Sequence, residues 1–444
     1  MQSAESRVRQ GRDRAPLIAL LVLGAALVVG LLVTTPWDPL GVPADAHVAV
    51  SPDRDFAPTE QALAEEYQHQ ARPYSYLGLA MSLGVMLFLG LTPAGARIAS
   101  SVGRRLRRGW VVQVLGGGLL LLLVVRLASL PFAARVEAVR SQYGLSTRSW
   151  WGWAGDVIRS FALNAGLTLL AVLVLVALAR AMPRRWWAPA AATGAALVVV
   201  VSFTYPLVVE PVFNRFTPMP QGELRDSLLG LAEADGVPVD EVLVADASRR
   251  TSTLNAYVSG FGPTKRIVVY DTLLEGAPPT EVESVVAHEL GHAAERDVLR
   301  GTLLGALGFA AAVCLLALLL RRPGLLRRAG ATGAGDPRVV PLVLALVAGL
   351  SFATGPVENL VSRRIETRAD VHALGLTRDP QTFASLQRSL ALASLADPDP
   401  PGVGFAMFAS HPTAPMRIAL ARTWAEQSGA PPVEDLAPVA GSPR

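Results

Sequence analysis

The pentapeptide His288-Glu289-Leu290-Gly291-His292 carries the clearest chemical signal in this 444-residue chain. Because an α-helix turns once in roughly 3.6 residues, His288 and His292 lie on one helical face with their imidazoles side by side. Two such histidines supply half of a zinc site, and the carboxylate of Glu289 can take a proton from water at the metal. The chain has only six histidines. A chance pair of surface histidines is therefore the weaker interpretation.

The residues around the pentapeptide predict that it lies on a helix. Thr280 and Glu283 have the spacing of a capping box, with Thr280 at the N-cap and Glu283 at N3. The apolar face of this helix would consist of Val282, Val285, Val286 and Leu290. We expect the helix to continue directly into the apolar segment that follows it.

A catalytic zinc ion needs a third protein ligand and one position left open for water. Glu366 is the best candidate, and Asp370 lies four residues further on, so both carboxylates share a helical face. Glu366 would bind the metal, and Asp370 would accept the free N–H of a ligand histidine. An ordinary charged helix, with Arg363 and Arg368 as salt-bridge partners, explains the same spacing equally well.

The elements that must position these residues belong to an unusually apolar chain. Hydrophobic residues make up 51% of the sequence and charged residues 17%, which is too apolar for a soluble enzyme. Seven stretches approach or reach spanning length, at residues 17–33, 76–91, 110–130, 158–178, 188–209, 302–320 and 339–352. The first lacks an immediate small-residue cleavage site, and we interpret it as an anchor. The sequence predicts a mainly α-helical, multi-pass membrane protein whose partner is the lipid bilayer.

The predicted spans divide five and two around a polar insert. In the insert we expect a helix at 222–235 and strands at 241–245, 255–259 and 266–270, the last two forming a hairpin. A small α+β domain would thus be split around the last two spans. The expected segments are a basic N-terminus at 1–15, five spans at 16–209, the insert at 210–301, two spans at 302–357, a helical part at 358–428 and a disordered tail at 429–444.

The arginine distribution predicts a topology. The net charge is only +4 and the arginines cluster beside the spans, so we expect no nucleic-acid partner. With seven spans, the arginine-rich segments 7–14, 97–108, 180–185 and 321–328 share one side of the membrane. The positive-inside rule makes that side cytoplasmic and places the insert outside the cytoplasm. Lys265 is the only lysine, and this arginine bias is typical of a GC-rich bacterial genome.

Further motifs occur in the order found in the M48 metallopeptidases. The chain resembles their Ste24 branch, the type I CAAX prenyl proteases, over nearly its whole length. The matching motifs are Phe213-Asn214-Arg215-Phe216-Thr217-Pro218 at the start of the insert, Asn255-Ala256-Tyr257, Lys265-Arg266-Ile267-Val268 and Asp271-Thr272-Leu273-Leu274 around the strand pair, Ser362-Arg363-Arg364 with Glu366 and Ala369-Asp370, and Ser410-His411-Pro412 followed by Arg417. The resemblance implies an integral-membrane zinc metalloendopeptidase with a gluzincin-type domain and seven helices that enclose a chamber.

The resemblance also implies the composition of the metal site. One Zn²⁺ ion per chain would be held by His288, His292 and Glu366, with Glu289 as general base. An alternative without catalysis is a seven-span scaffold or carrier that binds peptides in its chamber and holds zinc structurally. That alternative requires a missing base or a fourth protein ligand, whereas Glu289 is present and no cysteine or further histidine is placed to close the site.

Three more roles rest on the resemblance alone. It implies that Asn255 holds the substrate backbone and that His411 and Arg417 face the substrate and stabilise the oxyanion. Without it, Asn255 is interpreted as a strand terminus, His411 as a loop histidine and Arg417 as a solvated helix charge. The implied substrate is a peptide or a membrane-associated protein. CAAX processing needs prenylated partners, and a bacterial host favours a broader role on damaged or misrouted membrane-associated peptides.

Overall fold

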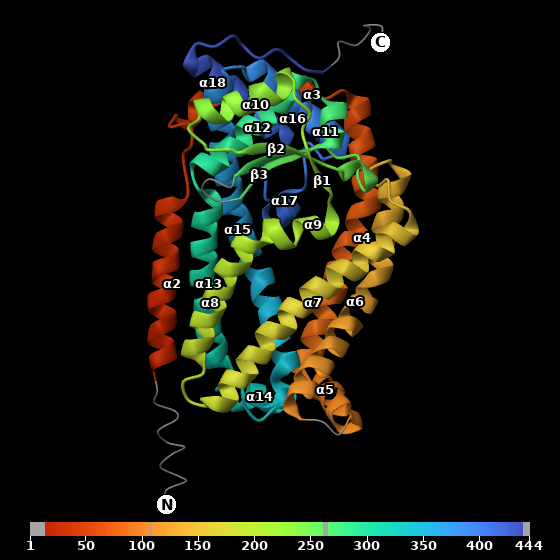
Figure 1. The fold of residues 1–444 in the computed structure, drawn as a ribbon, viewed down its shortest axis with the longest axis vertical. Helices are drawn as coiled ribbons and strands as arrows, with labels where there is room; N and C mark the ends of the chain where they lie inside the picture. Colours follow the sequence, from red (N-terminus) through yellow and green to blue (C-terminus); the bar gives the residue numbers. More distant parts are fainter. Residues whose placement is uncertain (1–13, 107–108, 261–264, 438–444) are drawn as a thin grey trace, which may run out of the picture.

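A computed structural model of the chain describes residues 14–106, 109–260 and 265–437 (Figure 1). The expected basic segment at 1–15 thus lies almost entirely outside the described residues. Within them, seven helices are long and apolar enough to cross a membrane, which confirms the predicted number of spans. These helices are α2 (Ala15–Thr34), α4 (Pro58–Leu91), α6 (Trp110–Gln142), α7 (Trp150–Ala181), α8 (Trp187–Val208), α13 (Asp297–Leu319) and α15 (Val340–Thr377).

Several of these helices extend well beyond their apolar stretches. The two spans that the sequence shows as short, at 76–91 and 339–352, belong to the 34-residue helix α4 and the 38-residue helix α15. At about 1.5 Å per residue, α15 is roughly 57 Å long, far more than the ~30 Å hydrocarbon core of a bilayer. Helix α15 therefore begins among the membrane spans and ends in the polar part of the protein.

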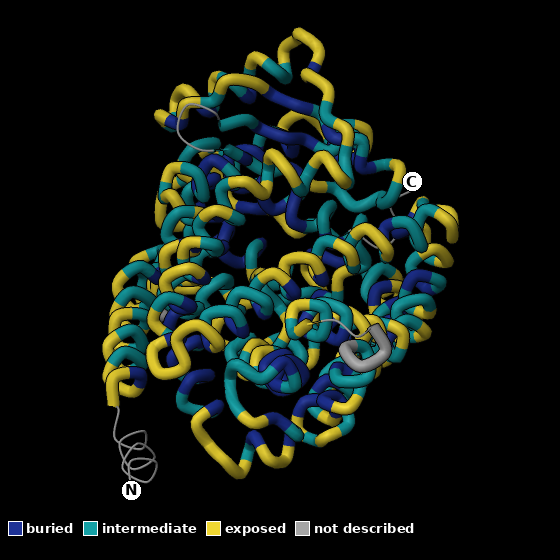
Figure 2. The backbone as a smooth tube through the Cα atoms, turned by 60° about the horizontal axis from the view of Figure 1, so that its bottom comes forward, coloured by how far each residue is buried: buried dark blue, intermediate teal, exposed yellow. Residues whose placement is uncertain are grey.

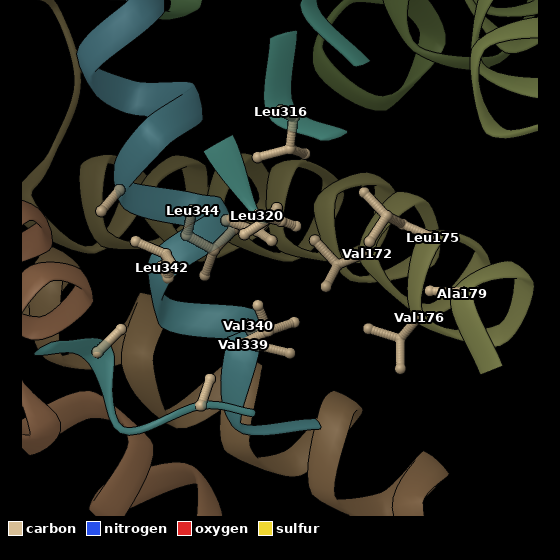
Figure 3. Packing of buried hydrophobic residues seen from close by; sticks show 14 of the residues in the cluster. Val172, Leu175, Val176, Ala179, Leu316, Leu320, Val339, Val340, Leu342 and Leu344 are labelled. Carbon is tan, nitrogen blue, oxygen red and sulfur yellow. The ribbon is translucent and has the colours of Figure 1, made fainter. Parts of the chain in front are cut away.

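The spans pack as a closed ring. Helix α13 packs on α8, α8 on α7, α7 on α6, α6 on α4, α4 on α15 and α15 again on α13, while α2 packs on α13. At one end the ring is filled by apolar side chains such as Val172 of α7, Leu316 of α13 and Val340 of α15 (Figure 3). Toward the other end, none of residues 346–365 of α15 is buried. The ring thus encloses a chamber that is closed at one end.

The closed end requires a close approach of two helices. A Cβ atom on Gly90 of α4 would overlap the side chain of Ala345 and the carbonyl of Pro341 in α15. Helix α5 (Pro93–Leu106), helix α14 (Pro323–Ala329) and the turn after α7 lie at this end, opposite the sheet (Figure 1). Apart from residues 107 and 108, which lie outside the described part of the chain, the arginine-rich segments after the first lie in or directly beside these elements. The described arginine-rich segments therefore share one end of the bundle, as their spacing predicts.

The polar domain lies at the other end and is built around a small sheet. The described residues form four strands in the order β1-β2-β4-β3, in which β2 is parallel to β4 and β3 antiparallel to β4. Strands β2 (Glu241–Ala245), β3 (Ala256–Ser259) and β4 (Arg266–Tyr270) agree with the predicted strands, whereas β1 (Phe216–Pro218), with three residues, was too short to predict. Strand β3 is an edge strand.

Helices cover the sheet and form the remainder of the polar domain. Figure 2 shows buried stretches concentrated here, while the long helices are mostly half-buried or exposed. The predicted helix at 222–235 is observed as α10 (Glu223–Ala234). The other helices are α3 (Pro52–Asp55), α9 (Glu210–Phe213), α11 (Asp271–Gly276), α12 (Pro279–Ala294), α16 (Pro380–Ser394), α17 (Gly402–Phe408) and α18 (Ala414–Ser428).

Two predictions about the helix that carries the pentapeptide are wrong. Helix α12 has Pro278 at its N-cap rather than Thr280, because a proline at the first helical position is preorganised for the helix. The helix also does not continue into the next span. It ends at Ala294, Arg296 adopts a left-handed conformation with φ 55°, and α13 starts at Asp297. Neither glycine nor proline marks this break in the sequence.

The loop between the first two spans is part of the polar domain. Asp55 is fully buried and pairs with Arg422 of α18, with Nη1 2.9 Å from Oδ2. Phe56 beside it packs into the core of α16 and α18. The expected disordered tail is instead ordered as far as residue 437, where Leu436 and Ala437 donate to the carbonyl of Arg54 at 3.1 and 3.0 Å. Residues 438–444 lie outside the described part of the chain.

We predict that Asp55→Ala destabilises the folded protein by about 3–5 kcal/mol, because the buried guanidinium of Arg422 loses its buried carboxylate partner and keeps only the exposed carboxylate of Asp435, 3.6 Å away, among the described residues. Arg54→Ala is the matched control. Its side chain is 42% exposed and pairs with Asp435, so its removal should change stability by less than about 1 kcal/mol. The measurement is unfolding of the detergent-solubilised variants, and equal midpoints for both variants would contradict the prediction.

Candidate metal centre

Two imidazoles and one carboxylate meet where α12 packs on α15. The Nε2 atoms of His288 and His292 are 3.2 Å apart. Glu366 of α15 places Oε2 3.2 Å from His288 Nε2 and Oε1 3.6 Å from His292 Nε2. One donor atom of each residue lies within 4.8 Å of the others. The structure thus joins the HELGH helix and the Glu366 helix, which the sequence alone left open.

The donor geometry fits a metal ion. A tetrahedral zinc site with Zn–N distances of about 2.0–2.1 Å places its donors roughly 3.3 Å apart. His288 Nδ1 lies 2.9 Å from Asp370, and His292 Nδ1 lies 2.9 Å from Asp297. Each Nδ1–H is therefore engaged by a carboxylate, so both Nε2 lone pairs point toward the same space. The two lone pairs repel each other, and a cation placed between them would remove this repulsion.

Each of the two carboxylates is held in turn by an arginine. Arg417 of α18 donates from Nε to Asp370 at 2.8 Å, and Arg368 of α15 pairs with Asp297. The site therefore has two parallel relays that run from histidine to aspartate to arginine. Helix α15 contributes to both relays, because Arg368 and Asp370 lie two and four residues after Glu366.

Asp370 occupies the position expected for it, whereas Asp297 is a residue that the sequence analysis missed. In one continuous helix, Asp297 would be five residues from His292 and about 140° away around the axis, since each residue turns about 100°. The break at Arg296 redirects the chain and brings Asp297 to within 2.9 Å of the imidazole. Only its place in the first turn after the motif could have indicated its role.

Glu289 lies beside the metal donors on the wall of a cavity. Burial raises the pKa of its carboxyl, while the nearby His288 and His292 lower it. A carboxylate with a raised pKa is a better proton acceptor near neutral pH. The cavity has a volume of about 840 Å³, and its wall includes His292 and Glu366 as well as Glu289. Glu289, two of the candidate metal donors and the open space are thus contiguous.

The three remaining candidates occupy different positions. His411 is 58% exposed and places Nδ1 2.9 Å from Glu366, next to the donors. Asn255 is exposed at the residue before edge strand β3. Arg417 is only 12% exposed, pairs with Asp370 and places Nη2 3.3 Å from His288 Nδ1. Arg417 thus lies behind a histidine, which differs from the substrate-facing position that we expected.

Comparison with known proteins agrees with this architecture. Residues 65–215 match the family described as CAAX prenyl protease N-terminal, five membrane helices, and residues 218–425 match Peptidase family M48. The chain is 30% identical over 374 residues to the uncharacterized metalloprotease YhfN of Bacillus subtilis, which covers 81% of this chain and 85% of that protein. The chain therefore belongs to peptidase family M48. It is an integral-membrane metalloprotease.

Two further relatives bear on the fold. The crystal structure of S. mikatae Ste24p superimposes with a TM-score of 0.69 at 21% identity, over 91% of this chain and 98% of that chain. The CAAX prenyl protease 1 of Saccharomyces cerevisiae is 33% identical over 184 residues, which is 38% of this chain and 41% of that protein. The first match confirms the predicted fold, a helical membrane chamber with a small α+β domain.

We predict that Asp297→Ala weakens metal binding by about 10–100-fold, as much as Asp370→Ala, because both aspartates orient a ligand histidine. Glu366→Ala should release the metal altogether. Competition with a chelator, followed by metal analysis of the purified proteins, measures the effect. Arg300→Ala is the control, since this 41% exposed side chain pairs only with Glu295 among the described residues. Wild-type affinity in the Asp297 variant would exclude the second relay.

Proposed function

We propose that this protein is a zinc endopeptidase in which His288, His292 and Glu366 hold one Zn²⁺ ion. The observation that carries the proposal is the pair of Nε2 atoms 3.2 Å apart, each on a histidine whose Nδ1 faces a carboxylate. Nitrogen and carboxylate donors in this number, with space left beside them, are typical of catalytic rather than structural zinc. When bound, zinc supplies Lewis-acid activation of water and of the scissile carbonyl.

The side chains around the metal position would then have different roles: proton transfer, hydrogen bonding to the oxyanion, and positioning of a ligand. Glu289 takes the proton of the attacking water and passes it to the departing amine. His411 donates to the oxyanion that develops on the scissile carbonyl, a contribution on the order of 3 kcal/mol for one such donor. Arg417 acts through Asp370 and His288 as a positioning residue and does not itself contact the substrate.

The free edge of strand β3 supports the proposal that the substrate binds in an extended conformation. Strand β3 pairs with β4 on one side only, so its other edge offers free backbone donors and acceptors to a peptide. Asn255 precedes this strand with an exposed side chain, in place to hold the substrate backbone. Such binding reads the backbone more than the side chains. We therefore propose peptides and membrane-associated proteins as substrates, without a requirement for prenylation.

We also propose that the active site faces the extracytoplasmic side of a bacterial cell membrane. The support is the position of α5, α14 and the turn after α7, which lie at the end opposite the sheet. The positive-inside rule assigns an arginine-rich end to the cytoplasm.

We expect Glu289→Gln to keep zinc bound and to abolish cleavage of an unprenylated test peptide, because the change removes the base and no metal ligand. Metal analysis and single-turnover cleavage in detergent measure the two properties. The His69→Gln variant is the control, since His69 is exposed on α4 and lies outside the wall of the cavity. Near wild-type turnover in the Glu289 variant would overturn the assignment.

The orientation can be tested with single cysteines in a Cys314→Ala background. Gln427 in α18 and Gly324 in α14 are both exposed, at opposite ends of the molecule. In intact cells, we expect an impermeant thiol reagent to label a cysteine at position 427 and to spare one at position 324. Labelling both in lysed cells is the control. The reverse pattern would place the active site in the cytoplasm.

A further inference from the structure

The cavity beside Glu289 extends well beyond the space that one peptide bond needs. It has a volume of about 840 Å³, and its wall continues from His292 and Glu366 to Lys265 and Arg296. Lys265 immediately precedes strand β4, and Arg296 lies four residues after His292, at the break between α12 and α13. Two cationic side chains therefore share a cavity with the base and with two metal donors.

Lys265 is the only lysine of the chain, and it forms no ion pair with a described residue. Its Nζ donates to the carbonyl of Ala293 at 3.4 Å, but no carboxylate lies within ion-pair distance among the described residues. An ammonium group has three N–H donors, so at least one remains available to a ligand. The contact with Ala293 at the end of α12 fixes the side chain at the cavity wall.

Arg296 is exposed and likewise has no ion-pair partner in the described part of the chain. The neighbouring carboxylates have other partners. Glu295 pairs with Arg300 and Arg368, and Asp297 pairs with Arg368 and His292. The backbone of Arg296 is left-handed, with φ 55°, a conformation that is uncommon for residues other than glycine and asparagine. Arginine thus occupies a backbone conformation that glycine or asparagine adopts more readily.

The two cations are close enough to interact. Burial and the charge of Arg296 both lower the pKa of Lys265, and Asp235 only partly offsets this effect. Asp235 lies on the same wall, but its Oδ1 accepts a hydrogen bond from His372 at 2.8 Å. The cavity therefore presents two cationic side chains that form no ion pair among the described residues, although the carboxylates of Asp235, Glu289, Asp297 and Glu366 line the same wall. An anion placed between the two side chains would satisfy their free donors and remove their repulsion.

We propose that Lys265 and Arg296 form a subsite for an acidic side chain of the substrate, an aspartate or glutamate close to the scissile bond. The inference rests on the proposed peptidase function and adds a sequence preference to it. Backbone pairing along β3 would align the peptide, and this subsite would select among aligned peptides by charge.

The test uses pairs of peptides that differ only by Glu or Gln at one position, scanned over several positions on both sides of the scissile bond. At one or two adjacent positions we expect the wild type to prefer Glu by about tenfold in kcat/KM, which corresponds to about 1.4 kcal/mol. The double variant Lys265→Gln, Arg296→Asn should bring the Glu/Gln ratio close to one. Glutamine can still donate to Ala293, and asparagine tolerates the left-handed backbone.

Arg225→Ala is the matched control, because it removes one positive charge from α10, outside the wall of the cavity. Its Glu/Gln ratio should equal that of the wild type. The Glu/Gln ratio compares two peptides with the same enzyme, so a general loss of activity does not change it. If the double variant is unstable, the Glu/Gln ratio of the single variant Arg296→Asn, at an exposed position, can be measured instead. A wild type without preference, or a preference that survives in both variants, would refute the subsite. Failure of the peptidase proposal would differ, because the Gln peptides would then not be cleaved at all.

Discussion

The packing of α12 against α15 is the contact on which the rest of the structure depends. It holds two imidazole nitrogens 3.2 Å apart and adds the carboxylate of Glu366. Such a cluster is unfavourable without a cation, so the surrounding protein must fix each donor. The two relays do so from opposite sides, through Asp370 with Arg417 and through Asp297 with Arg368. Both relays include residues of α15, so a single helix sets the geometry of the whole centre.

The same helix connects the centre to the membrane. Over its 38 residues α15 passes from the apolar core at the closed end of the ring to the polar domain. Between these two packed regions, residues 346–365 are not buried. The polar domain is further held by the loop between the first two spans, through the buried pair of Asp55 and Arg422. Packing concentrated at both ends leaves the intervening space open beside the active site.

Three groups of charged side chains lie at different places along the molecule. Carboxylates surround the metal donors, where they stabilise a cation and orient its ligands. Lys265 and Arg296 lie further along the same cavity, and most of the arginine-rich segments lie at the far end of the bundle. If the proposals above hold, acid–base chemistry, peptide selection and membrane orientation depend on different groups of charges. Substitutions in one group should leave the other two functions largely intact.

The sequence by itself determined the features that arise from neighbouring residues. Helical spacing put His288 and His292 on one face, long apolar runs predicted the seven spans, and short runs of strand-forming residues beside turn residues predicted β2, β3 and β4. Only the tertiary structure decided which distant residues meet. It joined Glu366 to His288 across 78 positions and Asp55 to Arg422 across 367 positions. It also broke the expected continuous helix at Arg296 and so brought in Asp297. The physical reason is that such contacts depend on how whole helices pack, which periodicity within a short window does not encode.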